Sequence, residues 1–414
     1  MLTNMIDKVH STRHWIGFPA LVLTQSASAF TENTYKIIVG LIAVDASVTI
    51  GKSYYLSLSG VLFVLPFLLV SGYAGQVADR FDKRKVLICL KMSEMVAVLV
   101  GIATIALGRI ELVLASLCLL AMLAAFSSPA KYGLLPEILP ARALPCGNAW
   151  LEITRYAGVI AGSAAGGLLM AGNRAGSALM VAVLLGSGGV TALASLLIVR
   201  GERAVSAQRL HWNPWQDVGV TLRHVATVRP LAVAIVCLTM FETLSTLMLL
   251  DAMMFGKRTL GITDVQIGFL PVAAGIGIGI GCALASRACH QGIRLALASR
   301  AFFGIGTVLL AIVAFNLQYA ATVGCFAALG FLGGFVVVPC NALIQAQSAG
   351  PQAGRTIALN NLLNMTGVLI GSAALWFLHD AIALSPRSIF GIVGLAALAV
   401  AGVVSRTLRP FRPA

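Results

Sequence analysis

Charged residues are scarce in this chain of 414 amino acids, where they make up 11% of the total. A soluble domain carries about 25%. Hydrophobic residues make up 58%, so the composition excludes an ordinary water-soluble domain. Apolar stretches of roughly 20 residues recur along the chain, and each is long enough to cross a hydrocarbon core of about 30 Å. The sequence therefore predicts several membrane spans.

Cysteine pairs and phosphate-binding loops are also missing. The eight cysteines include no C-x-x-C pair, so they indicate neither a metal site nor a disulfide framework. Four alternating glycines between 275 and 281 lie in an apolar run, and Gly51-Lys52-Ser53 lacks the upstream glycine of a phosphate loop. We therefore predict no metal, no cofactor and no nucleotide site.

Stretches that are apolar on every side predict α-helices, because the strands of a membrane barrel alternate in polarity. Charges and Gly or Pro clusters delimit twelve helices. Their predicted ranges are 16–43, 54–76, 86–107, 111–128, 147–171, 176–199, 230–255, 262–286, 293–315, 319–338, 355–378 and 386–405. The predicted fold class is an all-α membrane protein with twelve transmembrane helices.

Lysine and arginine are distributed unevenly between the two ends of these helices. Of the 29, 21 (Lys91 among them) fall on the side of both termini, six on the opposite side and two inside spans. Because basic residues concentrate in cytoplasmic loops, both termini are predicted to be cytoplasmic. This asymmetry explains the net charge of +14, so we expect no nucleic acid as a partner. The first apolar run is too long for a cleaved signal peptide and is expected to be retained.

Short patterns repeat between the two halves of the chain. Residues 158–165 (GVIAGSAA) match residues 367–374 (GVLIGSAA) at an offset of 209, and Pro129 lies 210 residues before Pro339. Chance matching of apolar sequence is the alternative to a duplication. We favour duplication, because transporters are often built from two related halves.

The duplication predicts two pseudo-symmetric six-helix bundles. The predicted domains are an N-terminal bundle at 1–199, a basic cytoplasmic linker at 200–229 and a C-terminal bundle at 230–414.

The stretch GQVADRFDKRK (75–85) carries the most specific local pattern and resembles the signature of the major facilitator superfamily, Gly-x-x-x-Asp-Arg/Lys-x-Gly-Arg/Lys-Arg/Lys. Asp82 stands where that family usually has glycine. Asp79 near a helix end can accept hydrogen bonds from the N-terminal amides of a neighbouring helix and pair with arginine. A solvated charge run that only sets topology is the alternative. We predict a latch between the bundles that can open, formed by the matching residues Gly75, Asp79, Arg80, Lys83 and Arg84.

Further motifs resemble those of bacterial lysophospholipid transporters: FSSPAKYG (126–133), GGFVVVPCNALIQ (333–345), LGITD (260–264) and SAFTEN (28–33). The resemblance runs from the first predicted helix through the eleventh. It implies a multi-pass protein of the bacterial inner membrane that moves lysophospholipids from the outer to the inner leaflet for reacylation. The implied partners are a lysophospholipid substrate, the surrounding membrane lipid and a separate acyltransferase.

Polar residues inside the first predicted helix are candidates for the substrate site. Gln25, Glu32 and Lys36 fall near one helix face, and Asn33 lies beside them. A charge at the bilayer centre costs about 2.5 to 3.5 kcal/mol, so such residues are expected to face a cavity or a partner. We predict that Glu32 meets an ammonium headgroup or a lysine in a cavity between the halves. A structural ion pair between Glu32 and Lys36 is the alternative.

Lys131 and Glu242 complete the set of predicted substrate-binding residues. Pro129 is predicted to end the fourth helix, so that the long stem of Lys131 places its ammonium at the level of lipid phosphates. Snorkelling alone is the alternative. An offset of 210 places Glu242 over Glu32. The resemblance implies an arginine in the seventh helix, but none lies between 231 and 256, so the headgroup preference stays open.

We therefore predict a secondary transporter that works by rocker-switch alternating access, and no enzyme. The leading alternative is a proton-coupled exporter of amphipathic drugs or metabolites, in which Glu32 and Glu242 bind protons or substrate. A lipid-modifying enzyme would need a base near a carboxylate, and the one tight pair, His379-Asp380, falls on the predicted outer side. A non-transporting scaffold for the acyltransferase is a further alternative.

Overall fold

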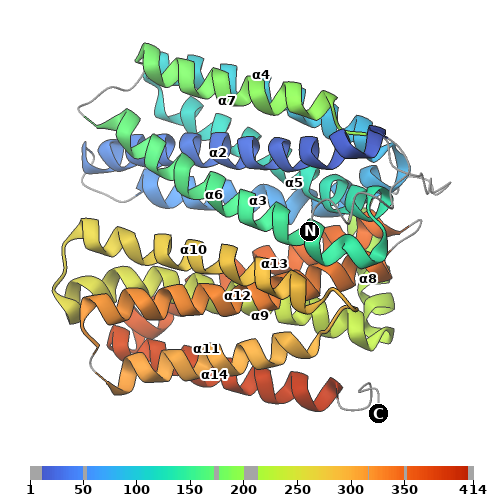
Figure 1. The fold of residues 1–414 in the computed structure, drawn as a ribbon. Coiled ribbons are helices and arrows are strands. Elements are labelled where there is room, and N and C mark those ends of the chain that lie inside the picture. The colour runs from blue at the N-terminus through green and yellow to red at the C-terminus, as the bar shows by residue number, and fades with distance from the viewer. Residues whose placement is uncertain are drawn as a thin grey trace. The chain divides into compact units, whose positions relative to one another are not determined.

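The computed structural model describes residues 12–49, 54–171, 177–199, 213–315, 317–348 and 352–408, and within these ranges all regular secondary structure is helical. Each of the twelve predicted helices overlaps a long helix (Figure 1). These are α2 (Thr12–Thr49), α3 (Tyr54–Arg80), α4 (Lys83–Ala106), α5 (Ile110–Ile138), α6 (Leu144–Met170), α7 (Ala178–Leu196), α9 (Arg229–Phe255), α10 (Asp264–Ala288), α11 (Ala296–Ala314), α12 (Tyr319–Gln347), α13 (Ala353–Trp376) and α14 (Pro386–Leu408).

Shorter helical segments complete the described chain. They are the 3₁₀ turn η1 (Ala141–Ala143), the helix α8 (Pro214–Thr227) and the π-helical turns η2 (Gly256–Leu260) and η3 (Phe377–Ala381). Helix α8 lies within the predicted linker, of which residues 200–212 fall outside the described part.

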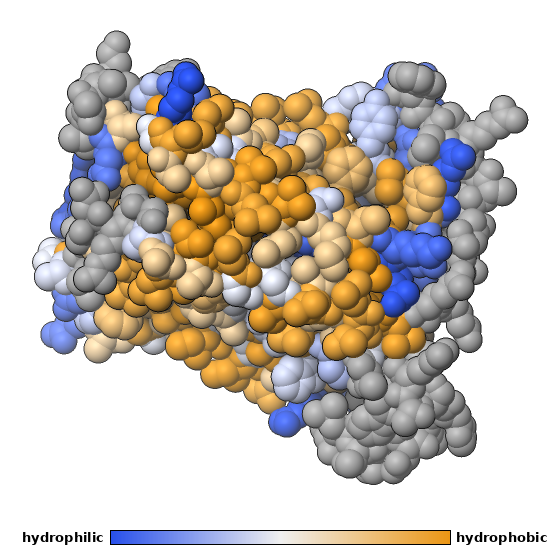
Figure 2. Space-filling view, turned by 90° about the horizontal axis from the view of Figure 1, so that it is seen from above, coloured by the Kyte–Doolittle hydropathy of each residue, from blue (hydrophilic) through white to orange (hydrophobic). Residues whose placement is uncertain are grey.

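Ten helices in the described ranges are long and apolar enough to cross a membrane. Helices α2 and α6 are as long but more polar, so the count of twelve spans stays a prediction, whereas the all-α membrane fold is confirmed. Figure 2 shows hydrophobic side chains over much of the face that it presents. Leu193, Phe303 and Leu395 are each more than half exposed. Apolar side chains exposed on this scale indicate a surface that faces lipid.

Residue contacts divide the chain into two compact units. Unit 1 comprises Met1–Pro140, Thr154–Gly219 and Ser348–Leu359, and unit 2 comprises Ala141–Ile153, Val220–Gln347 and Asn360–Ala414. Within unit 1, α5 packs on α2, α3 and α4, and α7 packs on α2 and α4. Within unit 2, α12 packs on α9, α10 and α11, and α14 packs on α9 and α11. The predicted domain limits at 199 and 230 stay a prediction.

Unit 1 has an apolar core in which α2 is fixed by its own aromatic residue. Tyr35, Ile38, Val98 and Leu184 are fully buried in this core. The Tyr35 hydroxyl lies 2.5 Å from the Ser116 hydroxyl of α5, so its polar end is satisfied inside apolar surroundings. This contact ties α2 to α5 close to the polar stretch that precedes Tyr35.

Helix α6 lies directly against α2 because its contact face consists of glycine. A Cβ atom at Gly158, Gly162 or Gly166 would lie under 3.0 Å from a backbone carbonyl oxygen of α2. Within unit 2, Gly367 and Gly371 of α13 approach backbone carbonyls of α9 in the same way. Small residues permit this close approach of two backbones. The sequence repeat at 158–165 and 367–374 therefore corresponds to a repeated mode of helix packing.

The same contacts show which residues of α2 and α9 occupy equivalent positions in the two units. Gly162 meets Phe30, whereas Gly371 meets Thr243, which relates the two helices by an offset of 213 residues. The equivalent of Glu32 is then Ser245, about one helical turn from Glu242. The offset of 210, which placed Glu242 over Glu32, is wrong for this pair of helices because the connecting segments of the two halves differ in length.

Gly162→Val is expected to destabilise the protein by about 1 to 3 kcal/mol, because the added atoms would collide with the α2 backbone. Gly167→Val is the matched control, since a Cβ at Gly167 meets nothing within 4 Å. Thermal midpoints of the two purified variants in detergent test this expectation. Equal midpoints for both variants would show that the glycine contact is unimportant.

Helices α5 and α12 continue through their prolines. Pro129 lies inside α5, which ends at Ile138, and Pro339 lies inside α12, which ends at Gln347. The predicted break at Pro129 is therefore wrong. A proline removes one backbone hydrogen bond, but an unwound segment among apolar helices would leave more backbone groups unpaired.

Candidate functional site

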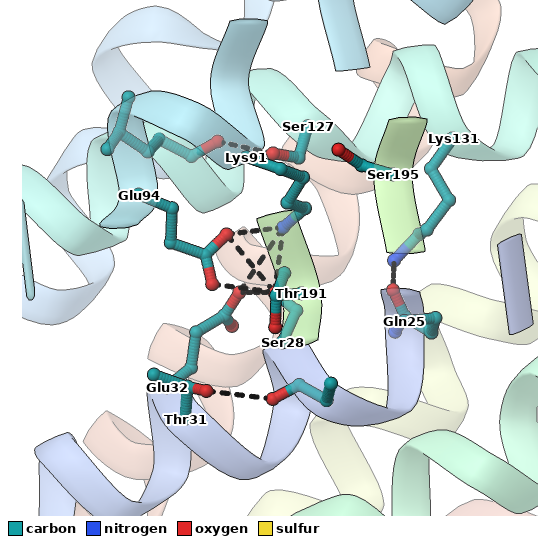
Figure 3. A network of polar contacts seen from close by, with 12 residues as sticks. Gln25, Ser28, Thr31, Glu32, Lys91, Glu94, Ser127, Lys131, Thr191 and Ser195 are labelled. Atoms are coloured by element: carbon teal, nitrogen blue, oxygen red, sulfur yellow. Dashed lines mark hydrogen bonds and ion pairs between the residues drawn. The ribbon is translucent and has the colours of Figure 1, made fainter. Parts of the chain in front are cut away.

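Polar side chains of α2 meet buried charges of α4 inside unit 1. Glu32, Lys91 and Glu94 point toward one another around the Ser28 hydroxyl (Figure 3). Lys91 Nζ donates to Ser28 Oγ at 2.7 Å and to Glu94 Oε2 at 2.5 Å. Ser28 Oγ lies 2.8 Å from Glu32 Oε1 and 2.9 Å from Glu94 Oε1. Because a hydroxyl carries one proton, Ser28 donates to one carboxylate at a time.

The two carboxylates of this cluster differ in access and in distance from the ammonium group. Lys91 Nζ lies 3.9 Å from Glu32 Oε1, farther than from Glu94. The Glu32 side chain is 28% exposed, whereas those of Lys91 and Glu94 are 4% and 3% exposed. Glu32 is therefore the member of the cluster that a ligand can reach.

Lys131 contacts α2 at Gln25, before the Ser28 cluster along the helix. Its Nζ donates to Gln25 Oε1 at 2.7 Å and lies 4.6 Å from the centroid of the Tyr132 ring. Figure 3 shows this contact beside the Ser28 cluster. Gln25 and Glu32 are seven residues apart, which places them on one face of α2 about two turns apart. This face of α2 thus combines an ammonium-bound amide with an accessible carboxylate.

The remaining predicted site residues on α2, Asn33 and Lys36, make contacts of their own. Asn33 Nδ2 donates to the Ala29 carbonyl of its own helix at 2.8 Å. Lys36 Nζ lies 4.2 Å from the centroid of the Phe63 ring, and the ion pair of Glu32 is formed with Lys91. The alternative of a Glu32–Lys36 ion pair is therefore wrong in this structure. Glu242 is half-buried on α9 in unit 2, and its role in the site stays a prediction.

Asp79 binds the first turn of α13. Its Oδ1 accepts from the Gly354 amide at 2.5 Å, and its Oδ2 accepts from the Arg355 amide at 3.1 Å. The Arg355 Nε lies 4.0 Å from Oδ2. First-turn amides have no partner within their helix and carry its positive dipole end, so a buried carboxylate suits this position. One turn earlier, Gly75 allows the approach, because a Cβ there would lie 2.8 Å from Ala358.

The basic residues of the signature make separate contacts. Lys83 Nζ lies 2.6 Å from Glu137 Oε1 of α5. The Arg84 guanidinium donates to the Leu196 carbonyl at 3.1 Å and to the Ile198 carbonyl, which satisfies the end of α7. Arg80 is exposed beside the Phe81 ring. Among the predicted latch residues, Gly75 and Asp79 contact the start of α13, and the part of Arg80, Lys83 and Arg84 in the latch stays a prediction.

Asp82, which replaces the usual glycine of the signature, caps the N-terminus of α4. Its side chain accepts from the amides of Arg84 at 3.1 Å and Lys85 at 3.4 Å. Aspartate is among the preferred residues at this position. Its φ of −59° requires no glycine, which explains why the departure from the signature is tolerated.

Comparison with known families decides the assignment. The family model of the Major Facilitator Superfamily matches residues 21–372. The chain belongs to this superfamily. Lysophospholipid transporter LplT of Pectobacterium carotovorum subsp. carotovorum is 31% identical, over 83% of this chain and 82% of that protein. LplT of Cronobacter sakazakii is 30% identical, over 86% of each chain. These relatives confirm the resemblance to bacterial lysophospholipid transporters.

Solved structures of other major facilitator proteins share the fold of this chain. The human organic anion transporter MFSD10 (TETRAN) superposes with a TM-score of 0.76 at 15% identity, over 94% of this chain and 99% of that chain. The Escherichia coli fucose:proton symporter FucP superposes with a TM-score of 0.70 at 16% identity, over 94% and 97%. At these identities the likeness concerns the fold alone.

Lys91 and Glu94 are the charged residues of this major facilitator protein that sequence reasoning missed. Lys91 was assigned to the cytoplasmic side, but it is 3% exposed within α4. A signal was present, because two opposite charges three residues apart inside a predicted span can pair on one helix face. Their contact with Ser28 and Glu32 depends on the packing of α2 on the rest of unit 1, which no local pattern reveals.

His379, the possible base of a lipid-modifying enzyme, contacts an arginine. His379 Nε2 lies 3.3 Å from Arg258 Nη1 within unit 2. The Asp380 side chain falls outside the described part of the chain. The relatives named above are transporters, and the superfamily to which this chain belongs is one of transporters.

Proposed function

We propose that this protein is a secondary transporter that moves lysophospholipids across the bacterial inner membrane. The observation that carries the proposal is the accessible Glu32 carboxylate on the face of α2 that also holds Lys131 through Gln25. The name of the relatives, lysophospholipid transporter, supports the choice of substrate. The direction that we propose is from the outer to the inner leaflet, where a separate acyltransferase would reacylate the lipid.

The Lys131 ammonium and the Glu32 carboxylate are complementary in charge to the phosphodiester and the amine of a phospholipid headgroup. A phosphodiester is anionic and would accept hydrogen bonds from the Lys131 ammonium. An ethanolamine headgroup ends in an ammonium, which would bind the Glu32 carboxylate. The acyl chain can stay in hydrocarbon while the headgroup crosses, so a lipid transporter needs no wide aqueous pore.

Alternating access by a rocker-switch movement is the mechanism that we propose for this fold, with both termini in the cytoplasm. The Asp79 contact with the start of α13 would act as the latch of that cycle, released and remade once per turnover. Glu242, Asn33 and Lys36 are proposed to line the path of the headgroup.

Glu32→Gln and Lys131→Ala are each expected to lower the initial rate of lysophosphatidylethanolamine uptake by roughly tenfold or more. The reason is that a hydrogen bond to a charged group contributes about 1.5 to 3 kcal/mol. Uptake of the labelled lipid into spheroplasts measures the effect. Exposed Glu111→Gln and Lys85→Ala are the matched controls, because they remove the same charges elsewhere.

Unchanged uptake in both site variants would contradict the assignment of the site. Absence of uptake by the wild-type protein in vesicles free of other proteins would contradict the transport function and favour a scaffold. Acid-driven efflux of dyes from everted vesicles would favour the exporter of amphipathic compounds.

A further inference from the structure

Glu32 and Glu94 compete for a single ammonium group. Lys91 Nζ lies 2.5 Å from Glu94 Oε2 but 3.9 Å from Glu32 Oε1. Lys91 and Glu94 are three residues apart on α4, so one helix face holds them together. Glu32 comes from α2 and reaches Lys91 only across the helix contact. In this structure Glu94 therefore holds the lysine.

The competition leaves Glu32 with a negative charge that the cluster does not balance. Counted by themselves, the Lys91 ammonium and the two ionised carboxylates carry a net charge of −1, and Lys36 and Lys131 attract the Glu32 carboxylate from outside this group. Ser28 donates its one proton to either carboxylate, so it does not change that balance. Charges interact more strongly in such a low-dielectric site than in water. Because Glu32 is the accessible carboxylate, a cation that binds the cluster would bind there.

We propose that Glu94 determines headgroup selectivity by binding Lys91 closely, so that the Lys91–Glu32 ion pair stays long and Glu32 is available for the cationic amine of a headgroup. This inference rests on the proposed function and names the preferred substrate as a lysophospholipid with an amine headgroup. Glu94 is a positioning residue, because it acts through Lys91 and is itself almost fully buried.

Removing the charge of Glu94 would reverse the competition. Lys91 Nζ needs to move by roughly 1 Å to reach the usual distance of about 2.8 Å from the Glu32 carboxylate. Lys91 would then neutralise Glu32 from within the protein. A headgroup amine would find its site occupied, whereas a headgroup without an amine would lose nothing.

The test compares two lysolipids that share the phosphodiester and differ in the amine. Purified full-length protein in proteoliposomes is assayed with labelled lysophosphatidylethanolamine and lysophosphatidylglycerol. The selectivity is the ratio of the two initial rates. The proteins are wild type, Glu94→Gln, the double variant Lys91→Met with Glu94→Gln, and Glu111→Gln as a control that removes an exposed carboxylate.

Glu94→Gln is expected to lower the ratio of ethanolamine to glycerol lipid by about tenfold, at the lower end of measured couplings between close charges. The double variant is expected to restore the ratio toward that of wild type, because no lysine remains to neutralise Glu32. A role of Glu94 in stability alone predicts no such recovery. For any variant that fails to reconstitute, the difference in thermal stabilisation by the two lysolipids in detergent gives the same comparison.

An equal loss of both lipids in Glu94→Gln would overturn the proposal, as would a double variant that keeps the lowered ratio. In either case, uptake of lysolipid by the wild type would leave the proposed function standing. A wild-type protein that moves neither lysolipid would contradict the proposed function and this inference with it.

Discussion

Lys91→Met is expected to lower the free energy of unfolding by about 3 to 5 kcal/mol, the cost of removing one partner from a buried ion pair. Lys91 is 3% exposed and donates to both Glu94 and Ser28. Methionine has a similar length but no charge, so packing is nearly conserved. Glu94 would remain buried without a cation, beside the second carboxylate of Glu32. The variant should therefore accumulate poorly and lose its thermal transition at a lower temperature.

The double variant Lys91→Met with Glu94→Gln separates this charge effect from a packing effect. Removing both members of the pair leaves no uncompensated buried charge at Glu94, so we expect most of the stability to return. Lys85→Met is the control, because Lys85 is exposed near the start of the same helix. Thermal midpoints in detergent and the monodisperse yield measure the outcome. A Lys91→Met protein as stable as Lys85→Met would show that the buried pair contributes nothing.

The helices of this protein were predictable because a helix that crosses a membrane needs a stretch of about 20 predominantly apolar residues, which is easily recognised in a sequence. Long apolar stretches predicted the twelve regions in which α2 to α7 and α9 to α14 lie. The glycine repeat at 158–165 and 367–374 was visible in the sequence, and the close helix packing at both sites follows from it because glycine has no side chain to keep two backbones apart. These signals are contained in the order of residues along single helices.

Features that depend on tertiary packing were harder to predict from the sequence. The partner of Lys91 on α2 lies more than 60 residues away in sequence, and only the packing of helices brings it near. Pro129 was expected to end its helix, as a proline can where the freed backbone groups bond to water. Inside an apolar fold the helix continues. The correspondence between residues of α2 and residues of α9 likewise became visible through the glycine contacts within each unit and not through sequence offsets.

Asp79→Asn is expected to release the start of α13 from α3 and to lower transport by roughly tenfold or more. The carboxylate accepts from two amides at once, through Oδ1 from Gly354 and through Oδ2 from Arg355. Asparagine offers one acceptor, and its NH₂ group would face the second amide donor. Hydrogen bonds to a charged group contribute about 1.5 to 3 kcal/mol each. Asp79 is 4% exposed, so water cannot replace the lost hydrogen bond. We therefore expect a large effect although asparagine and aspartate have nearly the same shape.

Asp82→Asn provides the matched control, because it makes the same substitution three residues away at the N-cap of α4, where asparagine caps as well as aspartate. Hydrogen exchange of the segment at 353–359 measures the release directly, and lysolipid uptake measures its consequence. Faster exchange in Asp79→Asn, with Asp82→Asn unchanged, is the expected pattern. Equal exchange in the two variants would mean that the α13 amides are held by other groups. Because Gly75 packs against Ala358 in the same contact, Gly75→Val should then also be without effect on exchange.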